Sequence, residues 1–119
     1  MTDSGGGTLN PEQIAQRAEA ILLDKQAIDL VVLDLRERSG ITDYCLVVSG
    51  TSPPHLKAMY DDVQRLLKAE GVYSYRATGD PASGWMVVDY IDVIIHIFSR
   101  KTREYYAIEK LWDQAPKPG

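Results

Sequence analysis

Two segments of this sequence have the pattern of strands that are apolar on both faces, and they limit the folds open to the chain. Asp29–Leu35 holds four consecutive apolar residues and then Leu35, and Asp92–Phe98 is apolar apart from Asp92 and His96. A strand with one solvated face alternates apolar and polar residues, whereas a strand without alternation is buried on both faces. Both segments therefore predict strands inside a sheet that packs against helices.

The rest of the chain alternates between helical and strand patterns. Helices are expected from Asn10 and Pro11 to about Lys25, from Ser52 to Gly71, and from about Thr102 to Trp112. Further strands are expected at Tyr44–Ser49, Val72–Thr78 and Trp85–Tyr90, with a loop at Gly79–Gly84 and a tight hairpin between the last two strands. Three helices and five strands in this order predict an α/β or α+β fold with a five-stranded mixed sheet. The helix between the second and third strands allows a right-handed crossover.

Capping residues support the expected ends of the first two helices. Asn10 and Gln13 have the spacing of a capping box, and Pro11 suits the first helical position. Ser52 is expected to cap the second helix, and Gly71 is expected to end it.

Length and composition indicate one domain. The chain has 119 residues, 45% of them hydrophobic, and one cysteine, so an internal disulfide is excluded. We expect a flexible lead at residues 1–9, a domain at 10–113 and a frayed tail at 114–119. No apolar run approaches the roughly 18 residues of a membrane span, and residues 1–7 lack the basic residues of a signal peptide. These features predict a cytoplasmic location, in a bacterium by default.

The charge balance argues against a protein that grips nucleic acid through its phosphates. The chain has 13 basic and 17 acidic residues, a net charge of −4. Proteins that bind nucleic acid through its phosphates usually carry an excess of basic residues or a dense basic face. Direct nucleic-acid contact is therefore expected to be minor.

Residues that could support catalysis have simpler structural explanations. Cys45 lies inside an apolar strand, which favours a core role. His55 and His96 are too few for a metal site. The turn Gly50-Thr51-Ser52 outlines a phosphate-binding turn but fits helix capping better. Asp89 and Asp92 flank a hairpin turn, where aspartate is common, although a carboxylate pair could also hold a metal. No Asp-x-Asp is present. We expect neither an enzyme nor a cofactor.

Polar and aromatic residues near the end of the chain indicate a binding surface. His96 interrupts an apolar strand, so it is either hydrogen-bonded within the fold or faces a partner. Trp85 and Tyr90 bracket one strand and are expected on opposite faces. Arg103, Tyr106 and Lys110 share one side of the last helix. Tyrosine, tryptophan and arginine are common at binding hot spots, although the same helix face could simply be solvated.

The core stripe of that last helix is expected to contain the other apolar residues. They are Tyr105, Ile108, Leu111 and Trp112.

The sequence resembles the ribosomal silencing factor family (RsfS, also called Iojap-like). The likeness extends over about residues 12–113. The matching segments are Ile28–Asp34, Gly40–Tyr44, Ser49–Ser52 with His55, Gly84–Tyr90, Asp92–Phe98 and Arg103–Trp112. No single segment is specific, but together they occur in the family's order and spacing.

The resemblance implies both a fold and a function. It implies a nucleotidyltransferase-like α/β fold without the catalytic carboxylates. It also implies binding to the large ribosomal subunit through its protein number fourteen, which blocks joining of the two subunits and represses translation. The implied partner-binding positions are Trp85, Tyr90, Tyr106 and Lys110, to which we add His96 and Arg103 from the residue pattern.

The sequence departs from the family pattern at two positions. Ile91 stands where the family usually has glycine in an Asp-x-Gly-Asp turn, so this turn must use another geometry or carry strain. Thr78-Gly79 stands where the family commonly has Glu-Gly.

Two alternative functions remain open. They are a degenerate nucleotidyltransferase using Asp89 and Asp92, and direct binding of ribosomal RNA through Arg100, Lys101 and Arg103. We also expect weak self-association as a homodimer, because three helices leave part of the sheet uncovered.

Overall fold

The computed structural model describes residues 9–37, 40 and 42–106. Its helices are α1 (Pro11–Asp24), α2 (Pro53–Ala69), the short 3₁₀ helix η2 (Pro81–Ser83) and α3 (Arg100–Tyr106). Its strands are β1 (Ile28–Asp34), β2 (Tyr44–Gly50), β3 (Arg76–Asp80), β4 (Trp85–Asp89) and β5 (Val93–Ser99). The predicted α/β class is confirmed.

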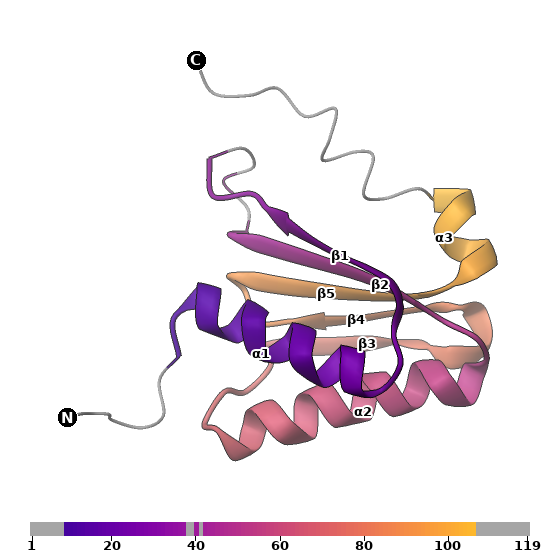
Figure 1. The fold of residues 1–119 in the computed structure, drawn as a ribbon, viewed down its shortest axis with the longest axis horizontal. Helices are drawn as coiled ribbons and strands as arrows, with labels where there is room; N and C mark the ends of the chain where they lie inside the picture. The colour runs from indigo at the N-terminus through magenta and orange to yellow at the C-terminus, as the bar shows by residue number, and fades with distance from the viewer. Residues whose placement is uncertain (1–8, 38–39, 41, 107–119) are drawn as a thin grey trace.

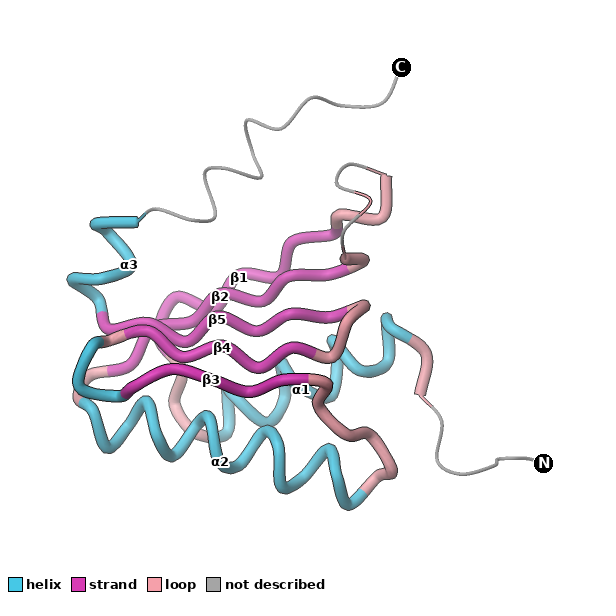
Figure 2. The backbone as a smooth tube through the Cα atoms, turned by 180° about the vertical axis from the view of Figure 1, so that it is seen from behind, coloured by secondary structure: helices cyan, strands magenta, loops and turns pink. Residues whose placement is uncertain are grey.

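The five strands form one mixed sheet in the order β1-β2-β5-β4-β3 (Figure 2). The central strands β2 and β5 are parallel, and the other neighbouring pairs are antiparallel. The hairpin expected between the last two strands is therefore present as β4 and β5. The helix α2 leads from β2 to the far edge of the sheet, where β3 lies beside β4.

Helix ends form where the capping residues predict them. The Asn10 carboxamide accepts from the Gln13 N–H, and the Gln13 side chain accepts from the Asn10 N–H. The Ser52 hydroxyl accepts from the His55 N–H at the start of α2. At the end of α2, Gly71 has a φ of 84° and its N–H donates to Lys68. This is a Schellman ending, for which glycine is the usual residue.

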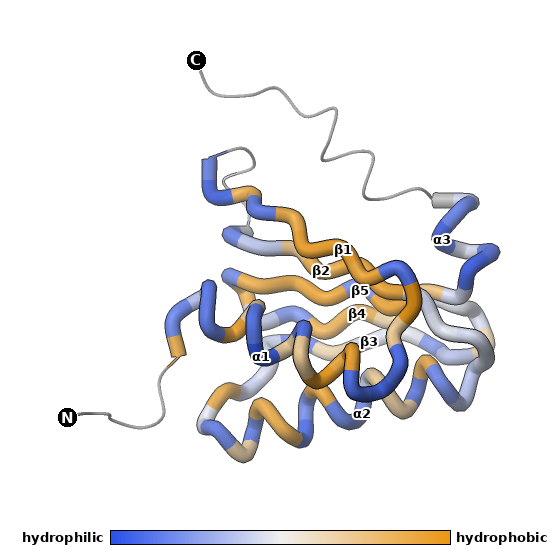
Figure 3. The backbone as a smooth tube through the Cα atoms, in the orientation of Figure 1, coloured by the Kyte–Doolittle hydropathy of each residue, from blue (hydrophilic) through white to orange (hydrophobic). Residues whose placement is uncertain are grey.

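The helices α1 and α2 cover one face of the sheet. In Figure 1 α1 lies in front of the strands, and in the view from behind the strands lie in front of α1 (Figure 2). Apolar side chains of both helices pack on alternate residues of the strands and form the main core. This core includes Ala18, Leu22, Leu56, Met59, Val63, Leu67, Leu46, Val48, Met86, Val88, Ile95 and Ile97. Figure 3 shows the strands β1, β2 and β5 as mostly hydrophobic and α3 as mostly hydrophilic.

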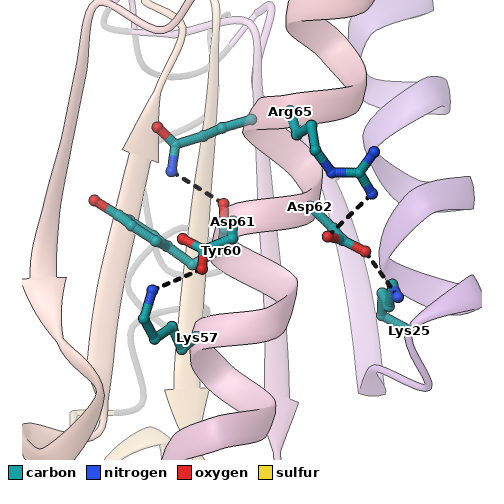
Figure 4. Close-up of polar contacts among 7 residues, drawn as sticks. Lys25, Lys57, Tyr60, Asp61, Asp62 and Arg65 are labelled. Atoms are coloured by element: carbon teal, nitrogen blue, oxygen red, sulfur yellow. Dashed lines mark hydrogen bonds and ion pairs between the residues drawn. The ribbon is translucent and has the colours of Figure 1, made fainter.

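Polar contacts join the end of α1 to α2. Asp62 accepts from Lys25 (2.8 Å) and from Arg65 (3.3 Å), as Figure 4 shows. The hydrogen bond from Lys25 is the main cause that lowers the pKa of the Asp62 carboxyl, and burial opposes it. His55 Nδ1 accepts from the Thr51 N–H (2.9 Å), so Nε2 carries the proton donated to the Lys25 carbonyl (2.7 Å). His55 therefore has a structural role, since its ring joins the start of α2 to the end of α1.

Three details of the predicted elements were wrong. The strand β1, expected inside the sheet and buried on both faces, lies at the edge of the sheet, where only β2 pairs with it and Val32 is 38% exposed. The third strand begins at Arg76, because Val72 packs on the core directly after the α2 ending and leaves residues 73–75 outside the strand. Gly79 and Asp80, which we expected in a loop, are strand residues paired with β4. The last error concerns Tyr105, which is 82% exposed and not part of the core. The other expected core residues of this helix, Ile108, Leu111 and Trp112, lie outside the described residues.

Candidate functional site

The second face of the sheet carries an apolar cluster that no described helix covers as α1 and α2 cover the first. We call this the open face. It is defined by Leu33, Leu35, Cys45, Val47, Trp85, His96 and Phe98. Leu35, Cys45, Val47 and Phe98 are buried, with Leu33 and Trp85 packed against them. The open face is therefore a second, smaller core whose outer layer consists of half-buried side chains.

Three rings lie together on the strands β4 and β5. The Trp85 indole N–H donates to His96 Nδ1 at 3.2 Å. The ring centroids of Trp85 and Phe98 are 5.2 Å apart, and the His96 ring stacks on Phe98 at 5.9 Å with an angle of 8°. This arrangement follows from the antiparallel register, which places Trp85 opposite Phe98 and Val87 opposite His96. The indole consequently has its polar atom satisfied inside the protein and its ring fixed against two neighbours.

His96 is neutral in this environment. Its Nδ1 accepts a hydrogen bond, so the proton of the neutral ring is on Nε2. Burial lowers the pKa of His96 to about 4, because the charged form loses its solvation. The sequence left open whether His96 is a hydrogen-bonded structural residue or faces a partner. The structure shows the hydrogen bond, and it also places the half-buried ring on the open face.

Arg103 lies at one end of the open face. Its guanidinium Nη1 donates to the Ser49 hydroxyl at 3.1 Å and to the Ile28 carbonyl at 3.5 Å. The start of α3 is held by Ser99, whose hydroxyl accepts from the Thr102 N–H at 3.2 Å. The first turn of α3 is thus attached to the ends of β1, β2 and β5. Arg103 is therefore partly engaged within the fold, and its role in partner binding stays a prediction.

Tyr90 lies on the other side of the sheet, in the core beneath α1 and α2. The prediction that Trp85 and Tyr90 occupy opposite faces is confirmed. Tyr90 is 8% exposed, and its buried hydroxyl has no hydrogen-bond partner within the described part of the chain. Burial raises the pKa of Tyr90 to about 12. A direct contact between Tyr90 and a partner remains a prediction, and it would require the hairpin end to rearrange.

The remaining predicted site residues lie on α3 and beyond it. Tyr106 is the last residue of the described helix, and Lys110 lies outside the described residues. The structure therefore brings together Trp85, His96 and Phe98 on the open face, with Arg103 at its end. Sequence reasoning missed Phe98 as a site residue. Its even spacing from His96 in one strand, which places both side chains on the same face, is the signal that could have found it.

The catalytic alternatives find little support in the geometry. Asp89 Oδ1 accepts from the Ile91 N–H at 2.6 Å, so it serves the turn. Cys45 is buried. Among residues 9–37, 40 and 42–106 no group of three or more His, Cys, Asp or Glu side chains is placed to hold a metal ion. Within the same ranges no helix is long and apolar enough to cross a membrane.

Comparison with known proteins identifies the family. The family model described as "Ribosomal silencing factor during starvation" matches residues 8–118. This chain belongs to the ribosomal silencing factor family. The ribosomal silencing factor RsfS of Bacillus subtilis is 32% identical over 91% of this chain and 92% of the relative. A crystal structure of a Chromobacterium violaceum protein is 31% identical, covers 93% of this chain and 92% of its own, and has a TM-score of 0.84.

A eukaryotic relative extends the comparison. The mouse "Mitochondrial assembly of ribosomal large subunit protein 1" is 33% identical over 78% of this chain, which matches 42% of that protein. The relatives are named for silencing or assembly of ribosomes. The family resemblance suggested by the sequence motifs is therefore confirmed, together with a role in ribosome silencing and translation regulation.

Proposed function

We propose that this ribosomal silencing factor binds the large ribosomal subunit through the subunit's protein number fourteen. Binding there blocks joining of the small subunit and so represses translation, without any catalytic step. The proposal includes the cytoplasmic location expected from the sequence. The observation that carries it is the open face, where the half-buried rings of Trp85 and His96, packed on the buried Phe98, form a fixed surface in a member of a ribosome-silencing family.

The geometry of the open face suits docking by burial. Trp85 is half-buried, and its indole N–H is already bonded to His96, so a partner can cover the ring without leaving a polar atom unpaired. The main core beneath α1 and α2 holds the sheet from the other side. A rigid surface loses little conformational entropy on binding, which leaves more of the contact energy available for affinity.

Subunit joining provides the test. Purified protein is added to dissociated subunits, Mg²⁺ is restored, and joined ribosomes are measured by sucrose-gradient sedimentation. We expect a reduced yield of joined ribosomes, with the protein in the large-subunit fraction only. An unchanged yield at saturating protein would contradict the proposal.

A point variant tests the surface. Trp85→Ala should weaken binding to protein number fourteen by about 2 kcal/mol, roughly thirtyfold, as truncation of a hot-spot aromatic does. Leu23→Ala is the matched control, because Leu23 is an apolar residue 52% exposed on α1, away from the open face. Melting curves establish that Trp85→Ala is folded at the assay temperature. If both folded variants bind like the parent, the open face is not the docking surface.

The last helix supplies a second set of expected contacts. We propose that Tyr106 and Lys110 act together in docking, because the sequence predicts a helix from about Thr102 to Trp112, in which residues four apart share one face. Tyr106→Ala should weaken binding by about 2 kcal/mol, and Lys110→Ala by less and with greater sensitivity to salt. The double variant should lose less binding free energy than the sum of the losses of the two single variants. Binding to protein number fourteen at two salt concentrations measures both effects, and parent-like binding by Tyr106→Ala contradicts this assignment.

The open face also supports a proposed homodimer. Two copies that each present an open face can bury these faces against one another, in which case self-association competes with ribosome binding. Light scattering across the micromolar range should show a concentration-dependent mass that Trp85→Ala lowers. A monomer at all concentrations would contradict the dimer while leaving ribosome binding unaffected.

A further inference from the structure

Two exposed tyrosines lie between α2 and β3, away from the open face. Tyr73 and Tyr75 are each 66% exposed, whereas Val72, which precedes them, packs on the main core. Ala77, in β3, packs on that same core, so residues on both sides of the two tyrosines contact the core beneath α1 and α2. Tyr73 and Tyr75 are two residues apart, so their Cα atoms lie within about 7 Å of one another. The surface is distinct from the one proposed for silencing.

Each tyrosine ring has a cation over one face. Lys68 Nζ is 5.9 Å from the centroid of the Tyr73 ring, and Arg76 Cζ is 5.6 Å from that of Tyr75. Within the described residues neither cation has a carboxylate partner in an ion pair. The aromatic rings are thus accompanied by two positive charges that form no ion pair among the described residues, in a protein whose net charge is −4.

The nearby carboxylates are already engaged. Glu70 pairs with Arg17 at 3.0 Å, and Asp89 accepts from the backbone of the hairpin turn at 2.6 Å. They reduce the positive potential of the surface but do not hold its two cations. We call the set Tyr73, Tyr75, Lys68 and Arg76 the tyrosine pair surface.

We propose that the tyrosine pair surface binds single-stranded RNA by stacking bases on Tyr73 and Tyr75. Aromatic rings accept any base because every base has a flat face, and Lys68 and Arg76 are placed to neutralise phosphates beside the stacked bases. Stacking supplies most of the affinity, which agrees with a chain that lacks a dense basic face. A peptide rich in proline would also pack on exposed aromatic rings, but it offers nothing to the two cations.

Fluorescence anisotropy with a labelled single-stranded RNA octamer and the full chain tests this proposal at low salt. Tyr73→Ala and Tyr75→Ala should each weaken binding about tenfold, as loss of one base–aromatic stack does. Both residues are exposed, so the variants should stay folded, which a melting curve checks. Tyr105→Ala is the matched control, since Tyr105 is an exposed tyrosine on α3. It should bind like the parent.

Salt dependence tests the role of the cations. Two neutralised phosphates predict a slope of about −1.4 for log K against log salt, and Lys68→Gln should reduce it by about 0.7. RNA binding that is absent, or that ignores both tyrosine variants, overturns the proposal. Binding of a proline-rich peptide without binding of the octamer also overturns it. The assay contains no ribosomal component, so its result is independent of the silencing role.

Discussion

The hairpin turn between β4 and β5 carries strain that a single substitution should release. Ile91 has a φ of 72°, and the Asp92 N–H donates to the Tyr90 carbonyl at 2.8 Å, which closes a three-residue γ-turn around Ile91. A γ-turn with positive φ is the rare, strained form, and a β-branched residue is poorly suited to it. The sequence offered either another turn geometry or strain at Ile91, and the structure shows the strained residue.

Comparing Ile91→Gly with Ile91→Ala isolates this strain. Both variants remove the same side chain, which is 55% exposed, but alanine keeps the Cβ that disfavours positive φ. That Cβ destabilises the folded state by about 1–2 kcal/mol. Part of the stability gained by removing the Cβ is lost again, because the greater backbone freedom of glycine stabilises the unfolded chain by about 0.4–1 kcal/mol. The glycine variant should therefore be more stable than the alanine variant by about 1 kcal/mol, which corresponds to about 5 °C in Tm for a domain of this size.

Urea unfolding followed by tryptophan fluorescence, with a thermal melt as a second probe, measures the difference. The control is the same pair of substitutions at Thr78, an exposed residue of β3 that does not have positive φ. There glycine should be less stable than alanine by about 0.5–1 kcal/mol. If Ile91→Ala is as stable as Ile91→Gly or more stable, the turn is not strained in the way the backbone indicates.

Three further predictions follow from buried groups and helix endings. Tyr90→Phe should stabilise the protein by about 1 kcal/mol, because it removes a buried hydroxyl without a hydrogen-bond partner, and urea titration measures this. It should also remove the contribution of Tyr90 to the loss of stability above pH 10, where unfolded Tyr90 ionises but the folded residue, with a pKa of about 12, does not. Stability should likewise fall as the pH drops from about 6.5 towards 4, because His96 is protonated more readily in the unfolded chain. His96→Gln should remove this contribution of His96 to the pH dependence, which urea titrations across that range measure. Gln26→Gly should raise the Tm by several degrees, since Gln26 has a φ of 63° at the end of α1, and an unchanged or lower Tm would contradict this.

Local signals predicted the helices and most strands of this fold. The capping box at Asn10 and the Ser52 cap act within four residues of sequence, so they can be recognised without knowing the rest of the structure. The ends of α1 and α2 show the limit of this reasoning. Both are Schellman endings, but one has Gly71 and the other has Gln26, so the glycine signal marks only one of them.

The third strand was misplaced because its position depends on pairing and not on its own composition. Val72–Tyr75 has the β-branched and aromatic residues of a strand, but strand pairing begins only where the chain reaches β4, with Arg76 opposite Asp89. Gly79 takes part in that pairing despite a φ of 120°, at a point where the backbone of Met86 leaves no room for a Cβ. Close approach between neighbouring strands explains why glycine is found there.

The candidate site could be predicted only in part for the same reason. Alternation along β4 and β5 assigns Trp85 and His96 to faces, but whether they meet depends on the register of the hairpin. That register is fixed by a γ-turn at a residue whose side chain disfavours it, so the sequence pattern alone could not supply it. The same register places Phe98 in the site, because Phe98 lies directly opposite Trp85.

The contact between His96 and Trp85 resolves why a polar side chain interrupts an otherwise apolar strand. The indole N–H of a half-buried tryptophan needs an acceptor, and a neutral histidine on the neighbouring strand supplies one while its ring still packs on Phe98. An apolar residue in place of His96 would leave the indole N–H without that partner whenever the open face is covered. The structural role of His96 and its proposed contact with a partner are therefore compatible, since the hydrogen bond would matter most if a partner excluded water from this face.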